Sequence, residues 1–132
     1  YNRGVATPTQ WNGHTDVIGA LAVGHNNKLY SGSDDCTIRV WSMEDGRCLQ
    51  TLTGHTNWVT GLAIGRDGTV YSASGDKTVR VWSGVDGSHL EILVGHTSSV
   101  RCVVVDQTNL VFSGSTDTTI KIWDPPPRPS TD

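Results

Sequence analysis

Four residue types that can act together in catalysis return three times along this chain, always 41 residues apart. The recurring residues are His14, Ser31, Asp35 and Trp41, then His55, Ser72, Asp76 and Trp82, then His96, Ser113, Asp117 and Trp123. A serine hydroxyl becomes a nucleophile when an imidazole takes its proton and a carboxylate orients that imidazole. A hydrolase needs one such set beside an oxyanion hole, and the sequence offers neither a G-x-S-x-G turn nor a helix N-terminus to supply one. The three equivalent copies therefore argue against catalysis.

A buried structural role explains why the four types recur together. An indole N–H needs an acceptor, a serine hydroxyl can accept and donate onward, and a histidine between serine and aspartate completes the chain of hydrogen bonds. We therefore expect one internal network in each repeat, holding the outer strands to the loop before the inner strand.

The sequence predicts no cofactor, no metal site and no disulfide. Cys36, Cys48 and Cys102 are odd in number, fall at unrelated phases of the repeat and show no C-x-x-C spacing. This cysteine usage favours a reducing compartment, inside the cell.

Each repeat contains short apolar or alternating runs of strand length, separated by turn formers such as Asp67-Gly68 and Asp86-Gly87. The runs are residues 17–23, 28–33, 37–42 and 48–53, then 58–64, 69–74, 78–83 and 89–94, then 100–105, 110–115 and 119–124. Helical periodicity is absent, so the chain is predicted to be all-β. A period near 40 residues with Gly-His at its start and Trp near its end is typical of a propeller array.

The repeat sets the expected domain boundaries. We expect one blade over residues 13–53, a second over 54–94 and a third over 95–124, which lacks its last strand. Residues 1–12 form an N-terminal segment that would supply an outer strand, because Trp11 is in phase with Leu52 and Leu93. Residues 125–132 form a proline-rich tail, either a stiff linker or a polyproline II ligand.

Composition indicates a folded globular chain, because 36% of its 132 residues are hydrophobic and 17% are charged. The formal charge of −3 comes without any Lys/Arg run, so nucleic acid and membrane surfaces are not expected partners. No apolar stretch reaches the roughly 18 residues that span a bilayer. The N-terminus has neither a start Met nor a signal-peptide core, so the chain is expected to be an excerpt from a longer intracellular protein of the cytoplasm or nucleus.

Over about residues 7–124 the chain resembles WD40 repeats. The run from Ser31 to Trp41 carries the pattern Ser-Gly-Ser-x-Asp-x-Thr-Ile-x-Val-Trp, and the Trp-Asp pair of the family occurs once, at Trp123-Asp124. The resemblance implies four-stranded antiparallel WD40-type β-propeller blades around a channel, without intrinsic catalysis. It also implies a scaffold for protein or peptide partners. A narrower alternative is the substrate-recognition part of a ubiquitin ligase or of another multi-subunit complex.

The resemblance also implies where partners bind, at the start of the inner strand and in the turn between the second and third strands. By position these residues are Val17, Gly19, Trp58, Thr60, Ser99 and Arg101, with Asp34, Gly75 and Thr116 in the turns. Trp58 and Arg101 are the strongest candidates because aromatic residues and arginine dominate interface hot spots. The alternatives are that Trp58 packs against a neighbouring blade and that Arg101 is a solvated rim charge.

Three blades do not close a propeller, which typically has four to eight. Either further repeats of a longer protein complete the ring, or copies of this chain do so as a homo-oligomer, two making six blades or three making nine. The unvarying 41-residue period makes the blades nearly interchangeable and favours copies. Residues 7–12 would then complete the third blade of a neighbouring chain.

Overall fold

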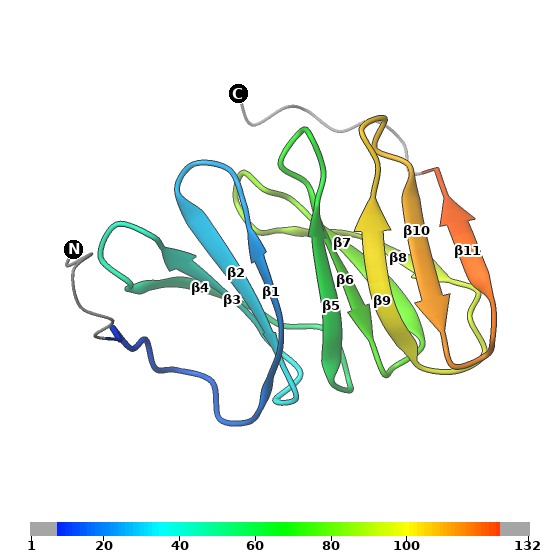
Figure 1. The fold of residues 1–132 in the computed structure, drawn as a ribbon, viewed down its shortest axis with the longest axis horizontal. Helices are drawn as coiled ribbons and strands as arrows, with labels where there is room; N and C mark the ends of the chain where they lie inside the picture. The colour runs from blue at the N-terminus through cyan, green and yellow to red at the C-terminus, as the bar shows by residue number, and fades with distance from the viewer. Residues whose placement is uncertain (1–7, 125–132) are drawn as a thin grey trace.

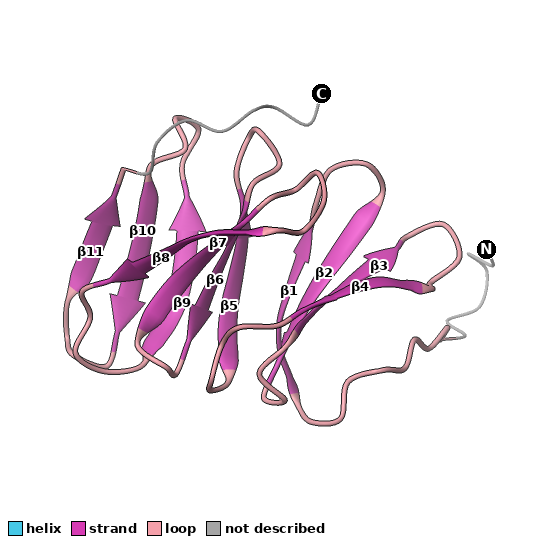
Figure 2. Cartoon of the chain, turned by 180° about the vertical axis from the view of Figure 1, so that it is seen from behind, coloured by secondary structure: helices cyan, strands magenta, loops and turns pink. Residues whose placement is uncertain are grey.

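The computed structural model describes residues 8–124, which form β-strands joined by turns, without a helix (Figure 1, and from behind in Figure 2). The strands are β1 (Ile18–Val23), β2 (Lys28–Ser33), β3 (Ile38–Ser42), β4 (Cys48–Leu52), β5 (Val59–Ile64), β6 (Val70–Ser74), β7 (Thr78–Trp82), β8 (His89–Val94), β9 (Val100–Val105), β10 (Val111–Ser115) and β11 (Ile120–Trp123). The all-β prediction is confirmed, and each strand lies within one of the predicted runs.

The strands form three antiparallel sheets in which neighbours along the chain are neighbours in the sheet. The first sheet has the order β1-β2-β3-β4, the second β5-β6-β7-β8 and the third β9-β10-β11. The third sheet thus has three strands within residues 8–124. Figure 1 shows the sheets side by side in chain order along the long axis of the molecule.

Tight turns connect the strands because their residues adopt left-handed backbone conformations. Asn26 and Asn27, between β1 and β2, have φ angles of 58° and 60°, and the Gly24 N–H donates to the Lys28 carbonyl at 2.8 Å to close their turn. Cys36, Lys77 and Thr118 occupy one repeat position between the second and third strands of each sheet, with φ between 73° and 78°. A non-glycine residue pays a steric cost in this region, so local hydrogen bonds must hold the turn.

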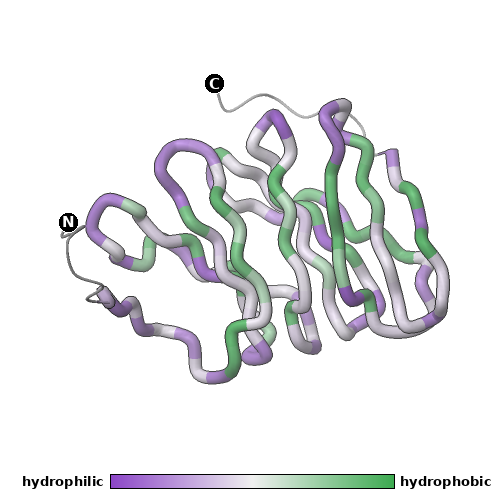
Figure 3. The backbone as a smooth tube through the Cα atoms, in the orientation of Figure 1, coloured by the Kyte–Doolittle hydropathy of each residue, from purple (hydrophilic) through white to green (hydrophobic). Residues whose placement is uncertain are grey.

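The apolar core lies between neighbouring sheets. Between the first and second sheets, the buried residues are Tyr30, Ile38, Val40, Leu52, Val59, Val70 and Trp82. Between the second and third sheets, they are Tyr71, Ala73, Val79, Val81, Leu93, Val100, Val103 and Val111. Figure 3 shows apolar stretches along the strands and polar residues in the turns at their ends. Each sheet therefore offers the same repeat positions to the sheet that follows it.

The N-terminal segment differs from its expected role as an outer strand. Residues 8–12 form no strand in this structure. Instead the ring of Trp11 stacks on that of Trp41, with centroids 6.0 Å apart and an interplanar angle of 29°. Residues 1–7 and the proline-rich tail of residues 125–132 lie outside the described part of the chain.

Candidate functional site: the polar networks and the pocket beside Trp58

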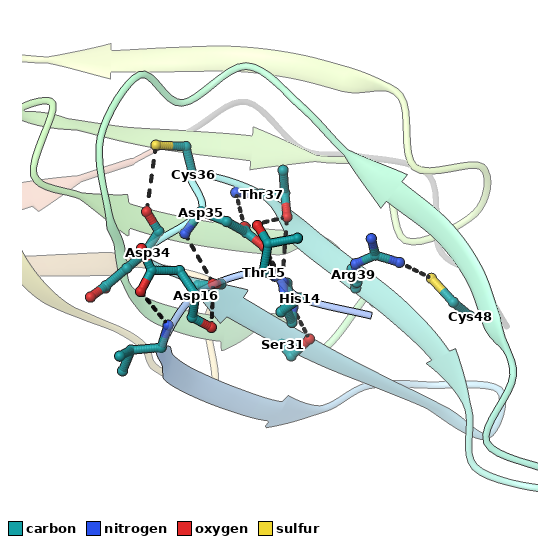
Figure 4. Close-up of polar contacts among 12 residues, drawn as sticks. His14, Thr15, Asp16, Ser31, Asp34, Asp35, Cys36, Thr37, Arg39 and Cys48 are labelled. Atoms are coloured by element: carbon teal, nitrogen blue, oxygen red, sulfur yellow. Dashed lines mark hydrogen bonds and ion pairs between the residues drawn. The ribbon is translucent and has the colours of Figure 1, made fainter. Parts of the chain in front are cut away.

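The four predicted polar residues of the first repeat form one hydrogen-bonded chain. Trp41 Nε1 donates to Ser31 Oγ at 2.7 Å. Ser31 Oγ lies 2.6 Å from His14 Nε2, and His14 Nδ1 lies 2.8 Å from Asp35 Oδ2 (Figure 4). The indole can only donate, so Ser31 Oγ accepts its N–H, and the Asp35 carboxylate can only accept, so His14 Nδ1 donates to it. In the neutral histidine Nε2 is then an acceptor for the Ser31 hydroxyl.

The second and third repeats carry the same chain of hydrogen bonds. In the second, the Trp82–Ser72, Ser72–His55 and His55–Asp76 distances are 2.8, 2.7 and 2.8 Å. In the third, the corresponding bonds among Trp123, Ser113, His96 and Asp117 are all 2.8 Å. The structure thus brings the twelve residues together in three separate sets of four, one in each sheet.

Each aspartate also holds the turn that contains the left-handed residue. Asp35 Oδ1 accepts the Thr37 hydroxyl at 2.6 Å and the Thr37 N–H at 2.9 Å, while Oδ2 accepts the Thr15 N–H at 3.1 Å. The equivalent threonines in the other sheets are Thr56, Thr78, Thr97 and Thr119. Sequence reasoning missed these threonines, although they recur at the same spacing of 41 residues and that recurrence was the available signal.

The hydrogen bonds keep the three carboxyl groups ionised. For Asp35 and Asp76, burial acts to raise the pKa, but the hydrogen bonds from the neighbouring threonine and histidine together outweigh it and hold the pKa well below its usual range. For Asp117, the Thr119 hydroxyl is the largest cause of an equally lowered pKa. Each network therefore ends in an anion that accepts several N–H and O–H groups.

The glycine of each Gly-His pair lets the backbone lie directly on the indole. A Cβ added to Gly13 would lie 3.0 Å from Trp41 Cη2 and 2.9 Å from Arg39 Nη1. A Cβ added to Gly95 would lie 3.0 Å from Trp123 Cη2. These distances are closer than ordinary van der Waals contact, so a side chain at this position would displace the indole or the arginine by a few tenths of an ångström.

The bonding order Ser–His–Asp is that of a hydrolytic triad, but the environment of the hydroxyl differs. Ser31, Ser72 and Ser113 are each at most 2% exposed, and each Oγ already accepts an indole N–H. A catalytic serine must reach a substrate carbonyl, and a buried hydroxyl held on both sides cannot. What the arrangement can do is tie the third strand of a sheet to its second strand and to the loop before its first.

A pocket of about 260 Å³ opens where the second and third sheets meet. Its lining residues are Asn57, Trp58, Thr60, Gly75, Ser99 and Arg101. Five of the nine predicted partner-binding residues therefore converge here, namely Trp58, Thr60, Ser99, Arg101 and, from the β6–β7 turn, Gly75. They come from segments up to 43 positions apart in the sequence.

The other predicted partner-binding residues lie outside this pocket. Val17 and Asp34 lie beside each other on the first sheet, where the Asp34 N–H donates to the Val17 carbonyl at 2.8 Å. Gly19 lies against the Val59 carbonyl. Thr116 donates its N–H to the Ser99 carbonyl at 3.0 Å, next to the pocket wall. These residues do not share a single binding site.

Hydrogen bonds to main-chain carbonyls hold the pocket walls. The Gly75 N–H donates to the Trp58 carbonyl at 2.9 Å, and the Thr60 hydroxyl donates to the Val100 carbonyl at 2.5 Å. The Trp58 side chain is 53% exposed, and Arg101 is exposed as well. The frame is therefore rigid, while an indole and a guanidinium remain accessible.

Asn57 is the pocket residue that sequence reasoning missed. Its Oδ1 accepts the Trp58 N–H at 2.7 Å. The repeat position holds Asp16 in the first sheet and Ser98 in the third, and both are small polar residues. The signal available in the sequence was that a polar residue recurs at this position, shortly before the first strand of each sheet.

The described part of the chain offers little for other chemistry. Within residues 8–124, no three His, Cys, Asp or Glu side chains gather in a way that could hold a metal ion. The three cysteines are free thiols. Over the same residues, no helix is long and apolar enough to cross a membrane.

Comparison with known proteins identifies the repeat. The chain matches the family described as "WD domain, G-beta repeat" over residues 6–42, 46–83 and 87–124. One segment is 45% identical over 40 residues to the probable E3 ubiquitin ligase complex SCF subunit sconB of Aspergillus clavatus, covering 30% of this chain and 6% of that protein. Another match, to the ribosome biogenesis protein bop1 of Danio rerio, is 40% identical over 43 residues, covering 32% of this chain and 6% of that protein.

Solved structures agree with the repeat assignment over most of the chain. The structure of U3-55K superposes with a TM-score of 0.82 and 29% sequence identity, covering 85% of this chain and 37% of that one. The WD40 β-propeller domain of Doa1 superposes with a TM-score of 0.78 and 30% identity, covering 83% of this chain and 37% of that one. The chain thus spans little more than a third of these solved chains and a small part of the curated relatives.

The expected fold is confirmed in its main features. Each sheet corresponds to one propeller blade, and the three blades form an arc that does not close. The three repeat matches, the three antiparallel sheets and the similarity to solved propellers together show that the chain belongs to the WD40 family.

Proposed function

We propose that this chain is a non-catalytic scaffold for protein partners and that the pocket beside Trp58 holds a peptide segment of one of them. The observation that carries the proposal is the convergence of Trp58, Thr60, Ser99 and Arg101 on one pocket at the seam of two sheets. Membership in a repeat family of β-propellers supports a binding role.

The pocket chemistry favours a peptide that combines an acidic group with an apolar side chain. The Arg101 guanidinium can pair with a carboxylate through charge-assisted hydrogen bonds. The half-exposed Trp58 indole offers an apolar face, and Asn57 offers an amide for main-chain groups. Because hydrogen bonds to main-chain carbonyls hold the pocket walls, little ordering cost would oppose binding.

The non-catalytic part of the proposal rests on the polar networks. The serine, histidine and aspartate of each network are engaged with one another and with a tryptophan, and the serines are buried. Three equivalent copies also fit a structural task better than a single reaction centre.

The relatives suggest, but do not specify, a role in a larger assembly. One is named as a subunit of an SCF ubiquitin ligase complex and another as a ribosome biogenesis protein, and they match this chain over only 40 and 43 residues. These short matches do not favour a ubiquitin ligase over another multi-subunit complex, and we propose only membership in such a complex. We place that complex in the cytoplasm or nucleus, supported by the three free thiols.

Selection from a display library of random dodecapeptides tests the binding proposal. The enriched peptides should carry Asp or Glu next to an apolar residue. Trp58→Ala and Arg101→Ala should each weaken binding of a synthetic enriched peptide at least about tenfold, as is typical of interface hot spots. Arg47→Ala is the matched control, because Arg47 is an exposed arginine between β3 and β4, far from the pocket lining. Equal binding by all three variants would contradict the proposal.

A further inference from the structure

Asn12 lies between two residues that pack on the same indole. Trp11, on its N-terminal side, stacks on Trp41 with ring centroids 6.0 Å apart. Gly13, on its C-terminal side, lies so close to this indole that an added Cβ would be 3.0 Å from Trp41 Cη2. His14 follows and enters the hydrogen-bonded chain of the first sheet. A chemical change at Asn12 therefore acts where the main chain meets that network.

Asn12 and Gly13 form the only Asn-Gly pair in the 132 residues. Such a pair is chemically labile, because glycine has no side chain to hinder attack of its main-chain nitrogen on the preceding amide. The Gly13 nitrogen gives up its proton and forms a bond to Asn12 Cγ, and the bond from Cγ to the amide nitrogen breaks. The amide nitrogen takes up the proton and leaves as ammonia, so that a cyclic succinimide remains. Water then opens the ring at either carbonyl, which gives aspartate or isoaspartate.

The surroundings of Asn12 favour this reaction. Asn12 is exposed and lies in no strand, and within residues 8–124 the Gly13 N–H donates no hydrogen bond that would hold it away. Gln10 Nε2 donates to Asn12 Oδ1 at 2.8 Å, and this donor stabilises the negative charge that develops on Oδ1 when Cγ is attacked. Arg39 Nη1 would lie 2.9 Å from a Cβ added to Gly13, and a cation at this place favours the deprotonated nitrogen.

Two other asparagines differ in their attacking nitrogen. Asn57 and Asn109 are followed by Trp58 and Leu110, whose side chains hinder the approach. Their main-chain N–H groups are also engaged, since that of Trp58 donates to Asn57 Oδ1 and that of Leu110 donates to Asp106 Oδ1. Of these three asparagines, only Asn12 combines exposure with an unhindered nitrogen next to it.

The same repeat position is exposed in the second sheet, which has a neighbouring sheet on either side. Thr53 and Gly54 stand 41 residues after Asn12 and Gly13. Both are exposed and lie outside any strand, although the first sheet precedes them. A Cβ added to Gly54 would lie 3.3 Å from Trp82 Cη2, so this glycine packs on its indole in the same way. The loop before an inner strand thus presents this position to solvent even where another sheet stands in front of it.

We propose that Asn12 is a site of spontaneous deamidation and that the isoaspartate formed there loosens the polar network of the first sheet. The reaction consumes water, releases ammonia and needs no other reactant. In isoaspartate the main chain runs through the former side chain and is longer by a methylene group, and the freed carboxylate adds a negative charge. Gly13 packs tightly on Trp41, so the added length shifts His14 relative to Ser31. The networks of the second and third sheets stay intact.

Incubation of the folded 132-residue chain in mildly alkaline buffer tests the chemical step, because a base removes the proton from the attacking nitrogen. Peptide mass spectrometry locates the lost amide, and an isoaspartate-specific methyltransferase measures the isoaspartate. Isoaspartate should accumulate first at position 12, at a rate close to that of the chain unfolded in urea. Asn12→Gln should abolish it there, because the longer side chain would have to close a larger ring.

The indole proton of Trp41 reports the effect on the network. Its solvent exchange, measured by NMR, should lose its protection in proportion to the isoaspartate formed, while exchange at Trp82 and Trp123 stays slow. Asn12→Asp, measured before incubation, is the matched control, because it adds the charge without lengthening the main chain. It should leave Trp41 protected.

Thr53→Asn transfers the reactive pair to the second sheet, because Gly54 follows position 53. This variant should form isoaspartate at position 53 in addition to position 12. Exchange at Trp82 should then become fast as well, since Gly54 packs on that indole.

Three outcomes would overturn the proposal. A folded wild-type chain that keeps its Asn12 amide, while the chain unfolded in urea loses it, would show that the fold protects Asn12. Isoaspartate at position 12 with slow exchange at Trp41 would show that the network accommodates the longer main chain. A folded Thr53→Asn variant without reaction at position 53 would contradict the argument from the repeat position.

Discussion

The second and third sheets carry the same polar network but differ in what covers them. His55 and His96 are each 6% exposed, and the hydrogen-bond distances of the two networks agree closely. Yet Val79 of the second sheet is fully buried and its repeat equivalent Ile120 is 75% exposed. The polar network therefore forms within a single sheet, whereas the burial of an apolar side chain depends on whether a neighbouring sheet covers it. Substitutions in the two kinds of residue should behave differently along the arc.

The largest difference is expected for a polar substitution in the apolar face. Val81→Asn should lower the free energy of unfolding by about 3–5 kcal/mol, because it leaves a buried amide unpaired and removes packing. Ile122→Asn, at the same repeat position on the third sheet, should change it by less than about 0.5 kcal/mol. Urea unfolding of the 132-residue chain measures both. Equal losses would mean that Ile122 is as well covered as Val81.

Removal of a network carboxylate should cost nearly as much, and similarly in both sheets. Asp76→Ala leaves the His55, Thr56 and Thr78 donors without their acceptor, at a cost of about 2–4 kcal/mol. Asp117→Ala should cost a similar amount despite the open face beside it.

Asp86→Ala is the control for this comparison, because Asp86 lies in an exposed turn and its removal should shift the unfolding midpoint little. Thermal denaturation of the three variants measures these shifts in the unfolding midpoint. A shift for Asp86→Ala as large as that for Asp76→Ala would remove the network from the account.

The same carboxylates predict a loss of stability in acid. Their pKa values are lower in the folded chain than the roughly 3.9 expected in the unfolded chain, so the unfolded state takes up protons first as the pH falls. Their contribution is fully present above about pH 5 and is lost progressively below about pH 4, toward the folded pKa.

Asp76→Asn and Asp117→Asn should each make the stability less dependent on pH in this acid range, by similar amounts. Urea midpoints measured between pH 2.5 and pH 6 test this expectation, a range chosen to span roughly the unfolded carboxyl pKa. An acid dependence identical to that of the wild-type chain in both variants would show that these carboxyls are not the cause.

The smallest effects are expected at the left-handed turn residue. Lys77 and Thr118 have φ angles of 78° and 73°, a region where glycine avoids a steric cost of about 1–2 kcal/mol but loses some of that gain as chain entropy. Lys77→Gly and Thr118→Gly should therefore each stabilise the chain by up to about 1 kcal/mol, in the covered and the open sheet alike. Differential scanning calorimetry resolves such shifts, and a clear loss in both variants would contradict this account of the turn.

Most of the fold could be predicted from the sequence. The apolar runs and turn formers predicted the strands, and the repeat period with the WD40 resemblance predicted their arrangement in blades. The fixed spacing of four specific residue types predicted the associations within the twelve-residue set. The threonines that bond to each aspartate were missed although they recur at the same spacing, because threonine is a common strand residue and its recurrence alone does not indicate such a bond.

Other features depend on how the sheets are arranged in three dimensions and were harder to predict from the sequence. Trp11 is in phase with two strand residues, but a strand needs a free sheet edge beside it, and the edge at β11 lies at the other end of the arc. Trp11 therefore stacks on Trp41 instead. The convergence of Trp58 and Arg101 on one pocket depends on how β5 and β9 pack, which the family resemblance suggested and the residue pattern alone did not.

Solvent exchange of the tryptophan indole protons, measured by NMR, tests most directly whether the recurring polar residues are internal supports of each sheet. The indole protons of Trp41, Trp82 and Trp123 donate to serine oxygens and should exchange slowly, whereas that of the half-exposed Trp58 should exchange fast. Ser72→Ala should accelerate exchange at Trp82 and leave Trp41 and Trp123 slow. Fast exchange at all four positions, or no effect of Ser72→Ala at Trp82, would contradict the account.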